Sequence, residues 1–192
     1  DLDELVDLIL LFQYLKPPQG RKLGLIGGGG GCSVLITDSC EKEDLIVPPF
    51  PDEVRRSLRE ILPEEADPGT IVRNPVDLSY SGASPNIFPA SFKTVADYDG
   101  VDFILLYANV DFGLYRGTNA LVSMQTDFLI ESKRNIDKPM AIILRHSDVP
   151  EATTLAFSIQ EKCARAGIPV FPSFTRAARA ISRFTQYYEG RR

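Results

Sequence analysis

Five consecutive glycines, Gly27–Gly31, constrain the fold of this chain more than any other feature. The strand-like segment Lys22–Ile26 precedes them directly, and a segment with helical spacing of its apolar residues begins near Cys32. Glycine accepts positive φ and close contact with its backbone, and the first N–H groups of a helix have no partner within that helix. The order of strand, glycine turn and helix therefore predicts a turn that holds an anion such as phosphate.

The anion is expected to contact the turn and the first residues of the helix. The candidate phosphate-binding residues are Gly28, Gly29, Gly30, Gly31, Cys32 and Ser33. The turn differs from a P-loop because no Lys-Ser or Lys-Thr pair follows it, and it lacks the acidic residue about 20 positions later that supports dinucleotide binding. A flexible turn without a ligand is the alternative. Each glycine costs about 0.5–1 kcal/mol in backbone entropy relative to alanine, which favours a binding role.

Strand-like and helix-like segments alternate along the chain. Nearly continuous Ile, Leu and Val predict strands at 22–26, 70–72, 102–107, 139–144 and 168–171. Helical spacing of apolar residues predicts helices at 2–16, 32–44, 51–62, 87–96, 119–133 and 150–166, and a last one after Ser173. This pattern is typical of a parallel sheet covered by helices on both faces. We therefore predict an α/β fold with an open parallel sheet of about five strands in the flavodoxin-like order.

The length of 192 residues suits one domain better than two. We expect residues 1–18 to form a leading helix and linker, residues 21–186 to form the core, and the end of the chain from Tyr187 to be a solvated tail or the start of a linker. The chain opens with Asp-Leu-Asp-Glu rather than Met, which predicts a piece of a longer polypeptide.

Composition excludes several classes of function. The net charge is −5 and no block of Lys and Arg is present, which argues against a nucleic-acid partner. No apolar run approaches the roughly 18 residues of a membrane span. Cys32, Cys40 and Cys163 are too few and too scattered for a disulfide framework or a metal site, so we expect free thiols in a reducing cytoplasm.

A second polar constellation, Asn74-Pro75-Val76-Asp77-Leu78, follows the predicted strand at 70–72. In an open parallel sheet the carboxyl ends of the strands share one edge, and ligands bind there. Asn74 and Asp77 are therefore expected to form a wall beside the glycine turn. A local Asx-type turn is the alternative interpretation.

Other polar residues follow predicted strands, but no catalytic residue is assigned. His146 is the only histidine, and without a Gly-x-Ser-x-Gly elbow a loop histidine with no catalytic role is favoured. Arg73 and Arg145 either neutralise a phosphate or lie in solvent. Asp38, in the helix after the glycine turn, faces either a ligand or water.

Four segments, taken in order, resemble a known family: Asp3–Leu8, Leu23–Val34, Arg73–Ser79 and Gly167–Phe171. They are similar to the second flavodoxin-like (CoA-ligase) domain of the NDP-forming acyl-CoA synthetases, which are relatives of succinyl-CoA synthetase. The resemblance covers nearly the whole chain. Many members have Asn-Ala-Gly-Gly-Pro-Gly in the glycine turn, whereas here Gly28 replaces the Asn and Ser33 replaces the last Gly.

The resemblance implies a role in phosphoryl transfer in the cytoplasm. Such enzymes hold a phosphohistidine between the N-termini of two helices, and the helix beginning near Cys32 matches one of them. The companions implied are CoA-binding and ATP-grasp domains or subunits. The substrates implied for the full-length enzyme are CoA, phosphate and ADP or GDP with Mg, with no tightly bound cofactor. His146 does not match the family's histidine, so the chain is expected to be inactive alone.

Two other functions stay open. The altered glycine turn is compatible with a regulatory ligand-binding module of a synthetase-like protein, such as one fused to a lysine acetyltransferase. The chain could also be a structural dimerisation domain, and a homo-oligomer is compatible with each of these functions.

Overall fold

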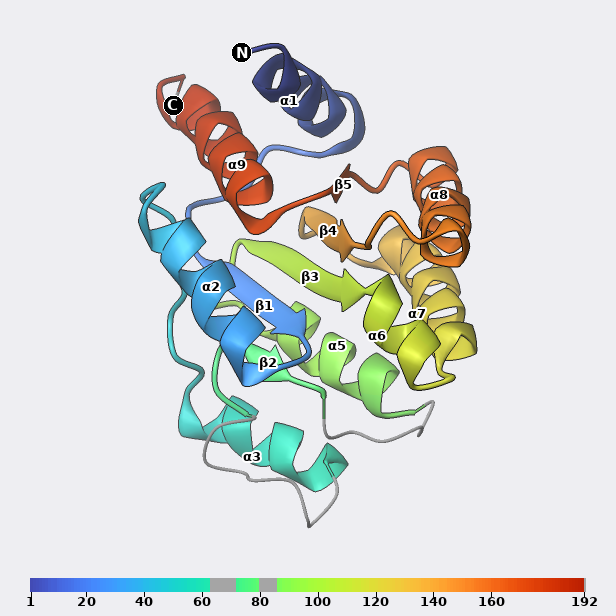
Figure 1. Ribbon diagram of the computed structural model, residues 1–192. Coiled ribbons are helices and arrows are strands. Elements are labelled where there is room, and N and C mark those ends of the chain that lie inside the picture. Colours follow the sequence, from blue (N-terminus) through green and yellow to red (C-terminus); the bar gives the residue numbers. More distant parts are fainter. Residues whose placement is uncertain (63–71, 80–85, 192) are drawn as a thin grey trace.

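The computed structural model describes residues 1–62, 72–79 and 86–191. Within these residues lies a parallel sheet of five strands in the order β2-β1-β3-β4-β5 (Figure 1). The strands are β1 (Leu23–Gly27), β2 (Val76–Asp77), β3 (Phe103–Asn109), β4 (Met140–Arg145) and β5 (Val170–Phe171). The predicted α/β class and the flavodoxin-like strand order are confirmed.

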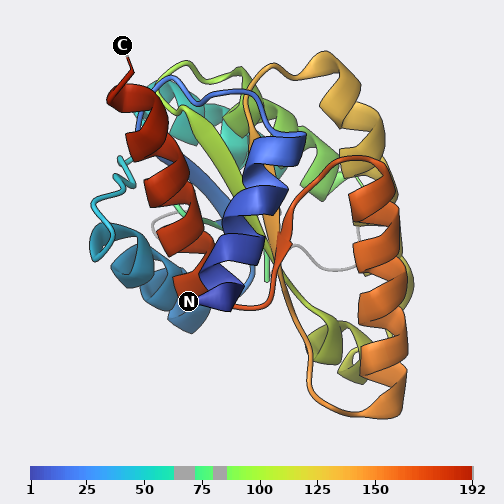
Figure 2. The same ribbon diagram turned by 90° about the horizontal axis from the view of Figure 1, so that it is seen from above.

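Helices cover both faces of the sheet, as Figure 2 shows from above. They are α1 (Leu2–Tyr14), α2 (Gly30–Glu41), α3 (Asp52–Ile61), α5 (Ile87–Asp97), α6 (Val110–Tyr115), α7 (Asn119–Ser132), α8 (Pro150–Arg165) and α9 (Phe174–Glu189). Side chains of α1, α2 and α9 pack on one face, and those of α3, α5, α7 and α8 pack on the other. None of the described helices combines the length and apolar character that a membrane crossing requires.

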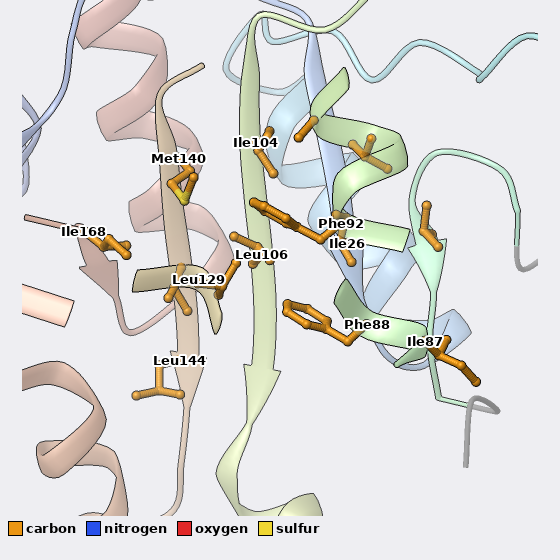
Figure 3. Packing of buried hydrophobic residues seen from close by; sticks show 14 of the residues in the cluster. Ile26, Ile87, Phe88, Phe92, Ile104, Leu106, Leu129, Met140, Leu144 and Ile168 are labelled. Atoms are coloured by element: carbon orange, nitrogen blue, oxygen red, sulfur yellow. The ribbon is translucent and has the colours of Figure 1, made fainter. Parts of the chain in front are cut away.

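The larger core cluster lies between the sheet and the layer that contains α5 and α7 (Figure 3). Phe92 of α5 meets Phe128 of α7 edge to face, with ring centroids 5.7 Å apart. Ile104 and Leu106 of β3 point to this side, whereas Leu105 points to the opposite cluster. The central strands are therefore buried on both faces, which explains their uninterrupted apolar sequences.

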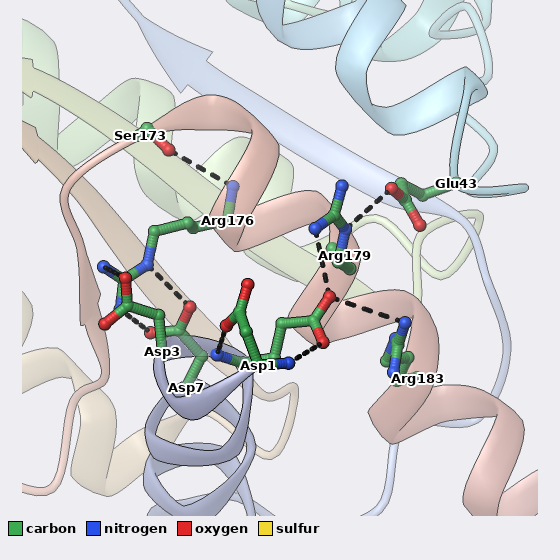
Figure 4. A network of polar contacts seen from close by, with 9 residues as sticks. Asp1, Asp3, Asp7, Glu43, Ser173, Arg176, Arg179 and Arg183 are labelled. Carbon is green, nitrogen blue, oxygen red and sulfur yellow. Dashed lines mark hydrogen bonds and ion pairs between the residues drawn. The ribbon is translucent and has the colours of Figure 1, made fainter.

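Ion pairs attach helix α1 to α9 (Figure 4). The buried side chain of Leu11 adds an apolar contact with the same core cluster as α9. The Arg176 guanidinium donates from Nε and Nη2 to the two Asp7 carboxylate oxygens, both at 2.8 Å. Arg179 donates to Glu4 on α1 at 3.0 Å and to Glu43 after α2 at 3.2 Å. The opposite face of α1 is exposed and apolar, and carries Leu2, Leu5, Val6 and Ile9.

Four local predictions differ from the structure. Residues 70 and 71 of the predicted strand lie outside the described residues. Val72 lies in a turn, and the edge strand forms after Pro75, where Val76 pairs with Ile26. Helix α2 begins at Gly30 rather than near Cys32, because the positive φ of the turn ends with Gly29.

The other two differences involve α6 and the end of the chain. Helix α6 was not predicted, and it begins where the Asn109 side chain accepts a hydrogen bond from the Phe112 amide at 3.1 Å. The predicted tail begins inside α9, which ends at Glu189, and Tyr187 and Tyr188 pack on Phe12 of α1.

Replacement of Arg176 by Met tests the attachment of α1. The variant leaves the Asp7 carboxylate, whose side chain is 4% exposed, without its two charged hydrogen bonds. We expect the free energy of unfolding, measured in urea, to fall by about 2–3 kcal/mol. Lys16→Met is the control, because it removes an exposed pair with Asp137 and is expected to cost less than about 1 kcal/mol. Equal losses in the two variants would contradict the interpretation.

Candidate functional site

The glycine turn joins β1 to α2 at the carboxyl edge of the sheet. Gly29 precedes the helix with φ 94° and ψ 120°, a conformation that L-residues with a side chain rarely adopt. The first helical hydrogen bond runs from the Ser33 amide to the Gly29 carbonyl at 3.0 Å. The amides of Gly30, Gly31 and Cys32 therefore have no partner within the helix and point out of its N-terminus.

The turn is open to solvent on its helical side. Gly30 and Gly31 are exposed, and a Cβ atom added to either would meet no heavy atom within 4 Å. The peptide dipoles of α2 add partial positive charge at the same point. The arrangement can hold an anion through backbone N–H groups alone.

Tyr107, near the carboxyl end of β3, closes one side of the turn. A Cβ atom on Gly27 would lie 2.8 Å from the Tyr107 Cβ, so glycine at this position permits the contact. The Tyr107 hydroxyl accepts from the Cys32 thiol at 3.4 Å and from the Asn109 amide at 3.3 Å. Burial raises the pKa of Tyr107 to about 12, so its hydroxyl stays neutral near pH 7. Gly28, Cys32 and Tyr107 line a shallow hollow beside the turn.

Asp77, the last residue of β2, lies next to the turn in register with Gly27. Its Oδ1 atom accepts from the Gly29 amide at 2.8 Å and from the Ser79 amide at 2.8 Å. The second of these bonds is the local Asx-type contact that was the alternative interpretation, and the first joins Asp77 to the glycine turn. Asp77 is only 8% exposed.

Asn74 lies beside β1, and its side-chain hydrogen bonds go to backbone. Its Oδ1 accepts from the Leu25 amide at 2.8 Å, and its Nδ2 donates to the carbonyls of Leu23 at 2.6 Å and Pro48 at 3.0 Å. These bonds brace the strand that carries the turn. Of the two predicted wall residues, Asp77 contacts the turn and Asn74 supports the strand behind it.

The remaining polar candidates do not form a catalytic relay. The Ser147 hydroxyl donates to Asp111 at 2.6 Å, whereas His146 Nδ1 lies 2.8 Å from the Ser147 carbonyl oxygen. The histidine therefore does not face the serine hydroxyl. Arg73 and Asp38 are exposed. Arg145 ends β4 opposite Asn109, and its charge acts on Tyr107, so it lies on the edge that carries the turn.

Large apolar side chains surround this edge. Val34 is 61% exposed and Leu35 is 54% exposed, both in the first half of α2, and Tyr115 at the end of α6 is 87% exposed. These groups and Tyr107 were not predicted as parts of the site. Because the carboxyl ends of parallel strands share one edge of the sheet, Tyr107 at the end of the predicted strand 102–107 could have been placed beside the glycine turn. No group of three or more His, Cys, Asp or Glu suited to a metal ion occurs among the described residues.

Comparison with known proteins finds similar enzymes. No protein-family model matches the chain. The sequence is 28% identical over 187 residues to the ADP-forming acetate–CoA ligase I of Archaeoglobus fulgidus, covering 97% of this chain and 24% of the relative. It is 34% identical over 76 residues to the ADP-forming acetate–CoA ligase of Methanocaldococcus jannaschii, covering 40% of this chain and 10% of the relative. The chain thus spans at most about a quarter of these relatives.

Solved structures share the fold. A protein of Pyrococcus horikoshii OT3 matches with a TM-score of 0.79 and 20% identity, over 98% of this chain and 40% of the other. Acetyl-coenzyme A synthetase 1 of Ca. Korarchaeum cryptofilum matches with a TM-score of 0.69 and 18% identity, over 100% of this chain and 38% of the other. The same synthetase has been solved in complex with phosphate and ADP.

The three thiols are expected to differ in reactivity. Burial raises the pKa values of Cys40 and Cys163 to about 12, whereas Cys32 is half-buried at the exposed turn. Because the thiolate is the reactive form, we expect a disulfide reagent at pH 8 to modify Cys32 first in the native protein, and all three thiols in denaturant. Cys32→Ser should remove the fast phase. A fast phase that persists in this variant would show that a buried cysteine is accessible.

Proposed function

Because this chain is homologous to a part of the ADP-forming acetate–CoA ligases, we propose that it is one domain of an NDP-forming acyl-CoA synthetase. In this proposal residues 1–192 form a single CoA-ligase-type domain. The glycine turn and the first turn of α2 hold the phosphate, or the phosphohistidine that carries the phosphoryl group between active sites. The domain contributes backbone amides and no reactive side chain.

One observation carries the proposal: three amides without helical partners, those of Gly30, Gly31 and Cys32, point from an exposed helix N-terminus. This geometry favours a multiply charged anion. Among the structural neighbours, the Ca. Korarchaeum cryptofilum synthetase in complex with phosphate and ADP is consistent with such a ligand. We infer that CoA, phosphate and ADP or GDP with Mg are substrates of the full-length enzyme, and that no cofactor is tightly bound.

The proposed enzyme needs companion domains. The relative from Archaeoglobus fulgidus is about four times as long as the stretch that this chain matches. The exposed apolar side chains of Val34 and Leu35 in the first half of α2, and of Tyr115 at the end of α6, favour a protein surface that covers this edge. We infer that CoA-binding and ATP-grasp domains or subunits supply the histidine and the nucleotide site, and that the enzyme works in the cytoplasm, where three free thiols are stable.

A regulatory ligand-binding module is the second candidate. The Asp77 carboxylate already accepts the Gly29 amide, which places a negative charge beside the proposed phosphate and favours weak binding. Steady-state ligase assays on the intact polypeptide separate the two functions. Turnover of acetyl-CoA, phosphate and ADP to acetate, CoA and ATP supports the synthetase, and phosphate binding without turnover supports the regulatory module.

The substitution Gly30→Asp tests the proposed phosphate contact. An added side chain at this exposed position meets no neighbour, and aspartate in the first turn of a helix is favourable, so the fold is expected to persist. Its carboxylate would occupy the proposed anion position. In the intact enzyme we expect transfer of labelled phosphate from ATP to histidine to fall at least about 100-fold, a loss of roughly 2.7 kcal/mol that is typical of a lost oxyanion contact.

Gln13→Glu on α1 is the matched control, because it adds the same charge at an exposed position away from the turn. The control is expected to label at the wild-type rate. Wild-type labelling of a folded Gly30→Asp enzyme would rule out a role of the glycine turn in holding the phosphohistidine.

A further inference from the structure

We propose that Asp77 is a positioning residue of the glycine turn: its carboxylate fixes the Gly29 amide, and its charge keeps anion binding at the first turn of α2 weak. This inference rests on the proposed phosphate-holding function and assigns to Asp77 more than a place in the wall of the site.

The contacts of β2 fix the turn on both sides of Gly28. The Leu78 amide donates to the Gly27 carbonyl at 2.7 Å, which continues the strand pairing one residue past Asp77. The Asp77 Oδ1 then accepts from the Gly29 amide at 2.8 Å. Five glycines in succession have large conformational freedom, and these two bonds limit it at the point where φ must become positive. The direction of the first turn of α2 therefore depends on Asp77.

The bond to Asp77 also decides which amides remain for a ligand. The Gly29 amide is already bonded, and the Ser33 amide bonds the Gly29 carbonyl. Of the predicted phosphate-binding segment, the helical amides left for an anion are those of Gly30, Gly31 and Cys32. The Asp77 carboxylate thus occupies one amide that a freely bound phosphate would otherwise use.

The charge of Asp77 acts against the ligand. The residue is 8% exposed and forms no ion pair with another described residue. A carboxylate one hydrogen bond away from the turn repels a phosphate dianion, and partial burial strengthens the repulsion relative to bulk water. A site that receives a phosphoryl group and passes it on must also release it, and this repulsion shortens the time for which the anion stays bound.

Geometry and charge can be separated with two substitutions. In Asp77→Asn the amide oxygen can still accept from Gly29 and Ser79, and the NH2 group replaces Oδ2, which accepts no hydrogen bond from another described residue. In Asp77→Ala both bonds are lost. Asp38→Asn, an exposed position later in α2, removes the same charge outside the turn and is the matched control.

The 192-residue chain and its three variants are titrated with inorganic phosphate, and chemical shifts of the Gly30, Gly31 and Cys32 amides report binding. Hydrogen exchange of the Gly29 amide reports the position of the turn without any ligand. We expect Asp77→Asn to bind phosphate roughly tenfold more tightly than the wild type and to keep the Gly29 amide protected. We expect Asp77→Ala to lose that protection at least about tenfold, and Asp38→Asn to match the wild type.

Phosphate affinity equal in the wild type and Asp77→Asn overturns the charge inference and leaves the phosphate site intact. Unchanged Gly29 protection in Asp77→Ala overturns the positioning inference. Absence of phosphate binding in both the wild type and Asp77→Asn overturns this inference together with the proposed function.

Discussion

The backbone polar groups of β1 must be satisfied on both edges of the strand, and this requirement shapes the site. On one edge β3 supplies a full partner, but on the other edge β2 is only two residues long and reaches Ile26 and Gly27. The Asn74 side chain takes the place of the missing strand, because its amide bonds the Leu25 N–H and the Leu23 carbonyl as a neighbouring backbone would. Without the Asn74 side chain, the buried strand β1 would carry unpaired backbone N–H and C=O groups. The glycine turn at its end would then lose its support.

Much of the architecture follows from sequence pattern, and the limits have physical causes. The strands around Leu105 and Ile142 are apolar on both faces, so their burial in a parallel sheet was predictable. The edge strand was misplaced because two residues carry no periodicity, and its position is set by contacts with β1. Helix α6 was missed because it is one and a half turns long and is started by a single capping side chain, that of Asn109.

The candidate site also has features that the sequence predicts and features that it does not. The glycine turn and the placement of Asp77 beside it were predictable, because strand order brings the carboxyl ends of β1 and β2 together. The direction in which each side chain points was not predictable. Sequence placed Asn74 and Asp77 in one wall, yet Asn74 bonds the strand and Asp77 bonds the turn. Tyr107 could have been placed at this edge as the last residue of the predicted strand 102–107, but its contact with Gly27 depends on a strand pairing that one sequence does not reveal.

The two faces of α1 respond to dissolved salt in opposite directions. The face that carries Asp7 and Glu4 is attached through charges, and dissolved ions screen the more exposed of these, such as the pair of Glu4 with Arg183. The outward face of Leu2, Leu5 and Ile9 is apolar, and sulfate strengthens its tendency to leave water. High sulfate thus weakens the exposed ion pairs of α1 while it favours adhesion of its outward apolar face to other molecules. Sulfate precipitation and storage at high ionic strength therefore favour self-association of this protein. A comparison of its sedimentation in sulfate with its sedimentation in dilute buffer would reveal this effect.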